Sequence, residues 1–223
     1  MTEVSRLLQN FSSIVVSGPD ALSLLQGQFT ADLRDLVAGQ SSYCAYCDGK
    51  GKVGWIFLVT YQNDGYCLTL LHELIPSFIA ELSKYAAFSE VTIEQSEEQV
   101  DGFLESDKQA IDKKIPLVYL ATQFKYFPHD LRLNELGALS FKKGCFKGQE
   151  IIARMEHRGN IKRRTYIVRH QEPVEIGAAI NSTHGQEIGS IVRTSDNISL
   201  AVIADSHLSE QLYIGQQAIE VIS

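Results

Sequence analysis

The sequence predicts an α+β domain followed by a small antiparallel β-barrel. In residues 1–164, strand-like runs alternate with stretches whose apolar residues recur at helical spacing. From Thr165 onward, short β-rich runs are separated by Gly, Asn and Ser at short intervals. Such short strands with frequent turn residues are typical of a small barrel or sandwich. We therefore predict two domains, 1–164 and 165–223.

The first elements are predicted from residues that begin or end helices and strands. "SIVVSG" (13–18) reads as a strand, and a helix is expected after it, with Pro19 and Asp20 in its first turn. Gly27 is expected to end or loosen this helix. "SSYCAYCD" (41–48) alternates as a strand does.

A hairpin and an amphipathic helix come next. The runs 53–60 and 66–71 flank "QNDG" (62–65), a strong hairpin signal. Apolar positions at helical spacing then predict a helix running to about Tyr85, with Pro76 in its first turn.

The middle of the chain is less regular. Residues 89–95 predict a strand, and the acidic, polar residues 96–113 predict a surface connection. "IPLVYLAT" (115–122) predicts a buried strand, and 127–140 predict a loop with a short helix. The barrel strands are expected within 165–170, 178–182, 187–194, 198–204 and 218–223.

Composition limits the functional classes. The chain has 223 residues, of which 44% are hydrophobic and 21% charged, typical of a soluble globular protein. The net charge of −7 argues against nucleic-acid binding by the whole surface, so no direct nucleic-acid partner is expected, although a local basic patch is not excluded. The sequence contains neither a bilayer-length apolar run nor a secretory signal pattern, and its four cysteines do not make a disulfide framework. These features predict a cytoplasmic protein without a membrane partner.

The densest chemistry lies in "SFKKGCFKGQEIIARMEHRG" (140–159). A helix is expected to begin at Gly148, so Cys145 would lie just before unpaired N–H groups that stabilise an anion. Together with Lys142, Lys143 and Lys147, these groups should lower the pKa of the Cys145 thiol. A thiolate attacks electrophiles, binds soft metals or exchanges disulfides.

Plainer interpretations stay open. A lone cysteine is most often a small buried apolar residue. The run "HRGNIKRR" (157–164) is either a solvated face or an anion-binding rim beside the cysteine. Cys44 and Cys47, with Cys67 and Cys145, would give four zinc ligands, but positions 44 and 47 of a strand point to opposite faces. No metal site is expected.

Three segments carry a resemblance to a known family. "KGCFKGQE" (143–150) is followed by "AR" at 153–154 and "HRG" at 157–159, and "LLQGQFTADL" (24–33) and "CDGKGKV" (47–53) lie earlier in the chain. They look like the signature and two further segments of the YgfZ family, relatives of the glycine cleavage T-protein (aminomethyltransferase). The resemblance covers about 1–95 and 115–223.

The resemblance implies a folate-binding α+β domain and a C-terminal β-barrel around a central channel. It also implies a reduced folate (tetrahydrofolate) as cofactor, and a role in iron–sulfur cluster assembly or repair that supports tRNA modification. Iron–sulfur assembly or client proteins would then be partners. Two departures are visible. The segment near 96–114 is shorter than in longer relatives, and Trp55 and Ile56 stand where aminomethyltransferases carry a catalytic aspartate. Without that carboxylate, aminomethyl transfer is not expected.

By resemblance, Cys145 is the reactive thiolate and Lys143 lowers its pKa. Gly144 and Gly148 would form the tight turn. Arg154, Arg158 and Lys162 would attract a glutamyl tail or an acidic partner, and Phe11, Phe29 and Trp55 are either pterin-stacking surfaces or core. The residues expected to bind the cofactor are Phe11, Gln28, Gly144, Gly148, Gln149, Glu150, Arg154 and Arg158. A folate-dependent one-carbon transferase and a non-catalytic scaffold are the alternative functions, so whether the protein is an enzyme stays open.

Overall fold

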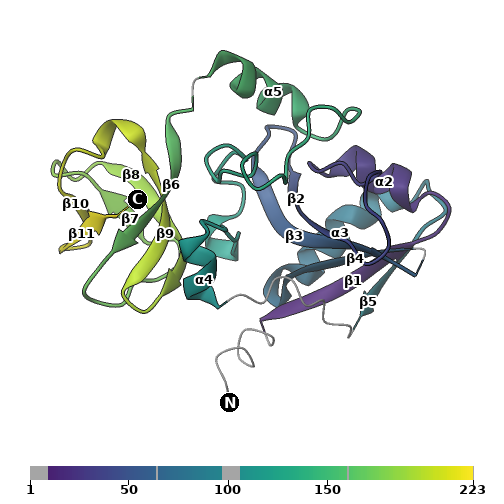
Figure 1. Ribbon diagram of the computed structural model, residues 1–223, viewed down its shortest axis with the longest axis horizontal. Coiled ribbons are helices and arrows are strands. Elements are labelled where there is room, and N and C mark those ends of the chain that lie inside the picture. Colours follow the sequence, from purple (N-terminus) through teal and green to yellow (C-terminus); the bar gives the residue numbers. More distant parts are fainter. Residues whose placement is uncertain (1–9, 64, 97–105, 160, 223) are drawn as a thin grey trace.

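A computed structural model describes residues 10–63, 65–96, 106–159 and 161–222. Figure 1 shows two lobes bridged by the middle of the chain and by helix α5 (Gln149–Arg158). We call the five-stranded sheet with its helices the sheet lobe, and the closed C-terminal barrel the barrel lobe. Within the described residues, no helix is long and apolar enough to cross a bilayer.

The sheet lobe is built on an antiparallel sheet of order β2-β3-β4-β1-β5. Its strands are β1 Phe11–Ser17, β2 Ser41–Cys47, β3 Val53–Gln62, β4 Gly65–Leu71 and β5 Thr92–Ser96. Helix α3 (Ile75–Ala86) follows a 3₁₀ turn, η1 (His72–Leu74), and has Pro76 in its first turn, as predicted.

Helix α2 (Ala21–Gln28) differs from the expectation in one respect. Gly27 lies inside it and does not end it. A Cβ at Gly27 would meet no atom within 4 Å, so the position tolerates glycine without needing it. The helix ends at Phe29, where the backbone becomes extended and pairs with Tyr46.

Aromatic side chains fill the core between α3 and the sheet. Phe29 and Phe57 meet edge-on with ring centroids 4.6 Å apart, and Trp55 lies 5.4 Å from Phe78. Phe29 is 0% exposed and Trp55 is 4% exposed. These two rings are therefore core residues and present no stacking surface to a ligand.

The middle segment corrects two predictions. Residues 115–118 are largely buried but pair with no strand, because Pro116 lacks an N–H and the Ile115 carbonyl accepts a hydrogen bond from Arg193. A 3₁₀ turn, η2 (Leu120–Thr122), follows. Residues 127–140 form successive turns where a short helix was expected. Before them, α4 (Asp107–Asp112) begins in the expected surface connection with a capping box at Ser106, and 97–105 lie outside the described residues.

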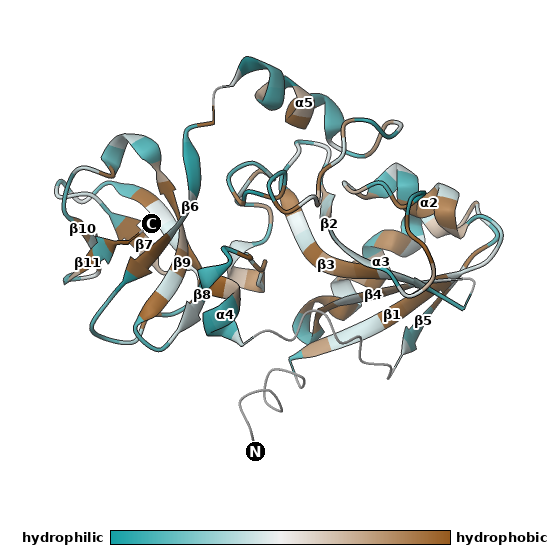
Figure 2. Ribbon diagram, in the orientation of Figure 1, coloured by the Kyte–Doolittle hydropathy of each residue, from teal (hydrophilic) through white to brown (hydrophobic). Residues whose placement is uncertain are grey.

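The predicted barrel is present and closes in the order β10-β11-β6-β9-β8-β7. Its strands are β6 Arg163–Arg169, β7 Ala179–Asn181, β8 Glu187–Ser195, β9 Ile198–Ala204, β10 Leu212–Ile214 and β11 Gln217–Val221. The sequence pattern missed the three-residue β10. The apolar residues of β8 and β9 divide between two clusters: Ile191, Ala201 and Ile203 pack in the barrel core, and others pack against the sheet lobe. Figure 2, coloured by hydropathy, shows hydrophobic stretches along the barrel strands. The domain boundary at 164 and 165 stays a prediction; β6 begins at Arg163.

The two lobes share buried contacts. Val192, Leu200 and Val202 of the barrel belong to the same apolar cluster as the sheet-lobe core. Arg193 of β8 is 1% exposed, and its Nε donates to Asp107 Oδ1 at 2.8 Å. The hydroxyls of Tyr126 and Ser190 are 2.5 Å apart.

Candidate functional site

The signature loop, residues 140–148, is anchored by two lysines. The first, Lys143, is buried, and its Nζ donates to the carbonyls of Phe29 at 2.6 Å and Ala31 at 2.7 Å. Burial lowers the pKa of Lys143 to about 8, although the nearby Cys44 and Asp32 act in the opposite direction. The ammonium therefore holds the loop against the segment that follows α2.

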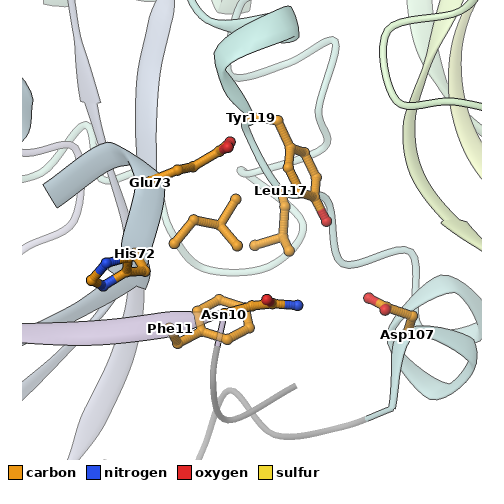
Figure 3. Close-up of a pocket in the computed structure, with 8 residues that line it drawn as sticks. Asn10, Phe11, His72, Glu73, Asp107, Leu117 and Tyr119 are labelled. Atoms are coloured by element: carbon orange, nitrogen blue, oxygen red, sulfur yellow. The ribbon is translucent and has the colours of Figure 1, made fainter. Parts of the chain in front are cut away.

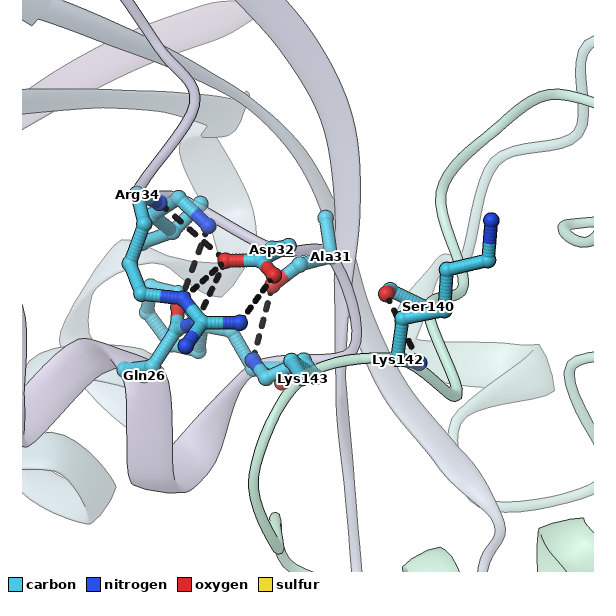
Figure 4. A network of polar contacts seen from close by, with 9 residues as sticks. Gln26, Ala31, Asp32, Arg34, Ser140, Lys142 and Lys143 are labelled. Carbon is cyan, nitrogen blue, oxygen red and sulfur yellow. Dashed lines mark hydrogen bonds and ion pairs between the residues drawn. The ribbon is translucent and has the colours of Figure 1, made fainter.

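That segment is itself held by a polar network (Figure 4). Gln26 Nε2 donates to Asp32 Oδ1 at 2.6 Å, and Gln26 Oε1 accepts from the Leu33 N–H at 3.0 Å. Arg34 donates to both oxygens of Asp32, and these hydrogen bonds are the main reason that the pKa of Asp32 lies well below its ordinary value. The carbonyls that receive Lys143 are thus in a fixed position.

The second anchor is Lys147. Its Nζ donates to Tyr46 Oη at 2.6 Å, to Tyr85 Oη at 2.8 Å and to Glu81 Oε1 at 3.0 Å. Burial works against the charge of Lys147, but the hydrogen bonds to Tyr85 and Glu81 outweigh it and raise the pKa. Lys147 therefore ties the loop to β2 and α3 together.

A close backbone contact fixes the end of the loop. Gly148 has φ of +80°, and a Cβ there would lie 2.5 Å from the Asp48 carbonyl oxygen. The same Cβ would lie 3.0 Å from the Cα of Gly51, in the turn between β2 and β3. The "GKG" turn and the signature, far apart in sequence, are therefore packed backbone to backbone. A Cβ at Gly144 would meet no atom within 4 Å, so the tight-turn role falls to Gly148.

Cys145 points away from these anchors. It is exposed, whereas Cys44, Cys47 and Cys67 are buried, and all four are free thiols. It lines an open surface cleft of about 610 Å³ at the start of α5 (Gln149–Arg158). The cleft is lined by Gly49, Cys145, Phe146, Gly148, Gln149, Glu150, Ile151 and Ala153. The thiol thus faces a cleft and not the packed interior, while its reactivity stays a prediction.

The other expected site residues are scattered. Arg154 pairs with Glu150 at 3.2 Å along the exposed surface of α5, and Arg158 is exposed in its last turn. Gln28 has a buried Oε1 without a partner among the described residues. Phe11 lies in a different cavity, to which the signature loop contributes no residue.

This second cavity, which we call the Phe11 pocket, has a volume of about 280 Å³. It is lined by Asn10, Phe11, Leu71, His72, Glu73, Asp107, Leu117 and Tyr119. Figure 3 shows the carboxylates of Glu73 and Asp107 and the ring of Tyr119 arranged around apolar side chains. Burial raises the pKa of Tyr119 to about 12, so its hydroxyl keeps its proton near neutral pH.

Sequence reasoning missed the polar residues of the Phe11 pocket because no motif joins them. They come from η1, from α4 and from the extended stretch before η2. It also missed His129, which is 2% exposed and whose Nε2 lies 2.6 Å from Glu156 Oε2, linking the turns after Tyr126 to α5. The only available signal was that "FPHD" runs without a break into the signature.

Cys44 and Cys47 lie in buried surroundings that favour the neutral thiol. Cys44 Sγ accepts from the Ala31 N–H at 3.4 Å, and burial raises the pKa of both Cys44 and Cys47. Raised thiol pKa values disfavour the thiolate that a metal would bind. Over the described ranges, no group of three or more His, Cys, Asp or Glu side chains is placed to hold a metal ion.

Comparison with known proteins gives the fold and the family. The chain aligns over 96% of its length with the glycine cleavage system aminomethyltransferase T of Bartonella henselae, at a TM-score of 0.68 and 14% identity, covering 83% of that chain. It therefore has the aminomethyltransferase fold, which confirms the predicted fold class. No family model matches the sequence.

Curated relatives are more similar in sequence. An uncharacterized protein of Haemophilus influenzae is 33% identical in an alignment that covers 78% of this chain and 76% of that protein. The tRNA-modifying protein YgfZ of Vibrio atlanticus is 31% identical in an alignment that covers 75% of this chain and 69% of the relative. That of Aliivibrio fischeri is 29% identical, with 87% of this chain and 82% of the relative covered. The chain belongs to the YgfZ family.

Proposed function

We propose that this protein supports iron–sulfur cluster assembly or repair, and thereby tRNA modification, with a reduced folate as cofactor and Cys145 as its reactive thiol. The observation that carries the proposal is the anchoring of the signature loop. Both Lys143 and Lys147 turn inward and Gly148 packs against the 48–51 turn, while Cys145 alone among the cysteines is exposed. Relatives named tRNA-modifying proteins support the link to tRNA modification, and we place this role in the cytoplasm.

The chemistry of the proposal is that of a soft ligand. A cysteine sulfur at an open cleft reaches a cluster iron or a persulfide carried by a partner protein, which a buried thiol does not. We assign Lys143 to positioning the loop, since its ammonium is bound to two backbone carbonyls. Gln149 and Glu150 form the rim of the cleft on the side of α5.

The residues of the Phe11 pocket fit part of a reduced folate. The amino and ring N–H groups of a pterin are hydrogen-bond donors, and Glu73 and Asp107 supply carboxylate oxygens as acceptors. Phe11, Leu71 and Leu117 supply an apolar surface for the ring. The Cys145 cleft fits less well, because Arg154 is paired with Glu150 and the cleft presents no lysine or arginine.

Folate binding is proposed here without aminomethyl transfer. Strand β3 carries no acidic side chain between Val53 and Gln62. A bound tetrahydrofolate would therefore lack the carboxylate that handles protons in the transferase reaction. Phe11, Glu73, Asp107 and Tyr119 would hold and orient the ring, and Tyr119 would keep a proton at its hydroxyl.

The thiol is tested by rescue in a bacterial strain that lacks its own relative of this protein. We expect Cys145→Ser to lose most of the rescue of an iron–sulfur tRNA-modifying enzyme, read as the modified nucleoside by mass spectrometry. Lys108→Gln, at an exposed position of α4 outside the signature loop, should rescue fully. Full rescue by Cys145→Ser would instead favour a non-catalytic scaffold.

The cofactor is tested by titration with tetrahydrofolate. We expect Glu73→Gln to weaken binding while keeping the Leu120 N–H bond to its side chain. An Arg154→Ala, Arg158→Ala double variant should bind as the wild type does. Loss of affinity only in the arginine variant would place the ligand beside the signature loop, and a wild type that does not bind would remove folate from the proposal.

A further inference from the structure

A group of cations near the end of α5 has no acidic partner. Arg154, Arg164 and Arg169 each pair with a carboxylate, Glu150, Asp205 and Glu220 respectively. Among the described residues, no such ion pair is made by Lys125, Arg158, Lys162 or Arg163, all of which are exposed. Lys50 and Lys108 are also exposed and make no such pair within the described residues, but three of these four cations fall within residues 158–163, in a protein of net charge −7.

These cations lie on neighbouring elements. Arg158 ends α5, Lys162 comes directly before β6, and Arg163 is the first residue of β6. Lys52, just before β3, donates from Nζ to the Lys125 carbonyl at 3.0 Å. Burial is the main cause that lowers the pKa of Lys52; the carboxylates of Asp130 and Asp48 act against it and the charge of Arg163 acts with it, so Lys52 lies near all three. We call Lys52, Lys125, Arg158, Lys162 and Arg163 the basic strip.

An exposed aromatic ring adjoins the strip. Phe124 is 40% exposed, and its edge packs on Trp55 with the ring centroids 5.4 Å apart. A Cβ on Gly54 would lie 2.5 Å from the Phe124 ring, so the ring rests directly on the β3 backbone. The Phe124 N–H donates to the Val53 carbonyl at 2.9 Å, and the next residue, Lys125, accepts from Lys52 Nζ through its carbonyl. The ring is thus held next to Lys52 and Lys125.

Two carboxylates lie close to the strip. Asp130 is 5% exposed, and its carboxylate accepts from the Phe127 N–H at 2.9 Å. The Glu156 side chain is 42% exposed, and its Oε2 lies 2.6 Å from His129 Nε2. One of the two carboxylates is therefore buried, and the exposed cations of the strip outnumber the exposed carboxylate beside them.

We propose that the basic strip and Phe124 bind a single-stranded segment of nucleic acid, RNA in the first instance, with one base stacked on Phe124 and the backbone phosphates on the cations. Aromatic faces beside cationic grooves bind single strands without strong sequence preference. An acidic protein face would use the cations but has no need of the ring. The inference goes beyond the proposed function, because it brings this protein itself into contact with RNA. It also departs from the expectation drawn from net charge, which concerned the whole surface.

The test is fluorescence anisotropy with a short labelled uridine-rich RNA over a salt series, using the full chain. We expect Lys162→Gln and Arg163→Gln to weaken binding, each reducing the slope of log affinity against log salt by about 0.7. Phe124→Leu keeps the apolar contact with Trp55 and should weaken binding about fivefold or more by removing the stacking face. Lys108→Gln, an equal charge change on exposed α4, should bind as the wild type does.

Three outcomes would overturn the proposal. They are no binding of RNA at low salt, equal weakening by Lys108→Gln, and binding that Phe124→Leu leaves unchanged while poly-L-glutamate competes fully. The last result would assign the strip to an acidic protein partner. A single-stranded DNA of the same sequence distinguishes the two kinds of nucleic acid. Weaker binding of the DNA would mean that the site prefers RNA, and equal affinity would mean that it accepts single strands of either kind. None of these results depends on Cys145 or on folate.

Discussion

At the scale of single residues, Gly148 is the position where the signature depends most directly on sterics. Its positive φ is favourable only to glycine, and its Cα faces the Asp48 carbonyl and Gly51 at backbone distance. Gly144, four residues earlier in the same motif, has open space around it. Two glycines that look equivalent in the sequence therefore have different roles.

We expect Gly148→Ala to destabilise the protein by about 2 kcal/mol or more, since the new Cβ needs both a left-handed backbone and a displaced turn. Gly144→Ala should change the free energy of unfolding by less than about 0.5 kcal/mol. Urea denaturation of both variants measures the difference. Equal stabilities would mean that the 48–51 turn moves aside freely.

The lysines show where sequence reasoning reaches its limit at this scale. The pattern around Cys145 predicted a cysteine outside the packed interior, and the thiol is exposed, while its reactivity stays a prediction. It gave no direction for Lys143, whose partners Phe29 and Ala31 lie more than 100 residues away in sequence. The hydrogen-bond partners of a long, flexible lysine side chain are set by the tertiary fold, so the local sequence does not predict them.

At the scale of elements, the Lys147 network makes α3, β2 and the signature loop dependent on one carboxylate. Glu81 accepts from Lys147, Tyr46 and Lys84. Burial alone would raise the pKa of Glu81, but these hydrogen bonds outweigh burial and lower it to about 2. The carboxyl pKa is thus lower in the folded state than its ordinary 4.5.

A depressed carboxyl pKa stabilises the fold fully above the unfolded value, and the contribution is lost as pH falls toward the folded value. We therefore expect the free energy of unfolding to fall between about pH 5 and pH 2. Glu81→Gln should be less stable at pH 7 and should show a shallower decline in that range. Glu94→Gln, on the exposed face of β5, should keep the wild-type slope, and an unchanged slope in Glu81→Gln would contradict the assignment.

Sequence pattern predicted the elements with strong local signals. The hairpin between β3 and β4, the amphipathic α3 and most barrel strands follow from alternation, helical spacing and turn residues. It failed at 115–122, where an apolar run is buried by its neighbours but Pro116 and the Ile115–Arg193 bond replace strand pairing. It also missed β10, which is too short to show alternation.

At the scale of the whole molecule, the site residues that sequence reasoning missed depend on contacts between lobes. The Phe11 pocket uses Asp107 of α4, and Arg193 of the barrel holds that carboxylate. No sequence pattern predicts such a contact, since Asp107 and Arg193 are 86 residues apart in the chain. The barrel thus contributes to the pocket without lining it.

The same pair links the stability of the lobes. Arg193 is almost fully buried, and its charge is balanced by Asp107, so removing the carboxylate charge leaves a buried guanidinium uncompensated. We expect Asp107→Asn to cost about 2–3 kcal/mol, at the lower end for such a loss because the amide oxygen still accepts from Nε.

Trp55, the single tryptophan, reports the sheet lobe by fluorescence, and far-UV circular dichroism reports both lobes. In the wild type, the two signals should change at the same urea concentration, because the lobes share one apolar cluster. In Asp107→Asn, the circular dichroism transition should begin earlier than the fluorescence transition, as the barrel loses its counter-charge and unfolds first. Lys108→Gln, at the next position, should leave both transitions where they are, and coincident, unshifted transitions in Asp107→Asn would show that apolar packing alone couples the lobes.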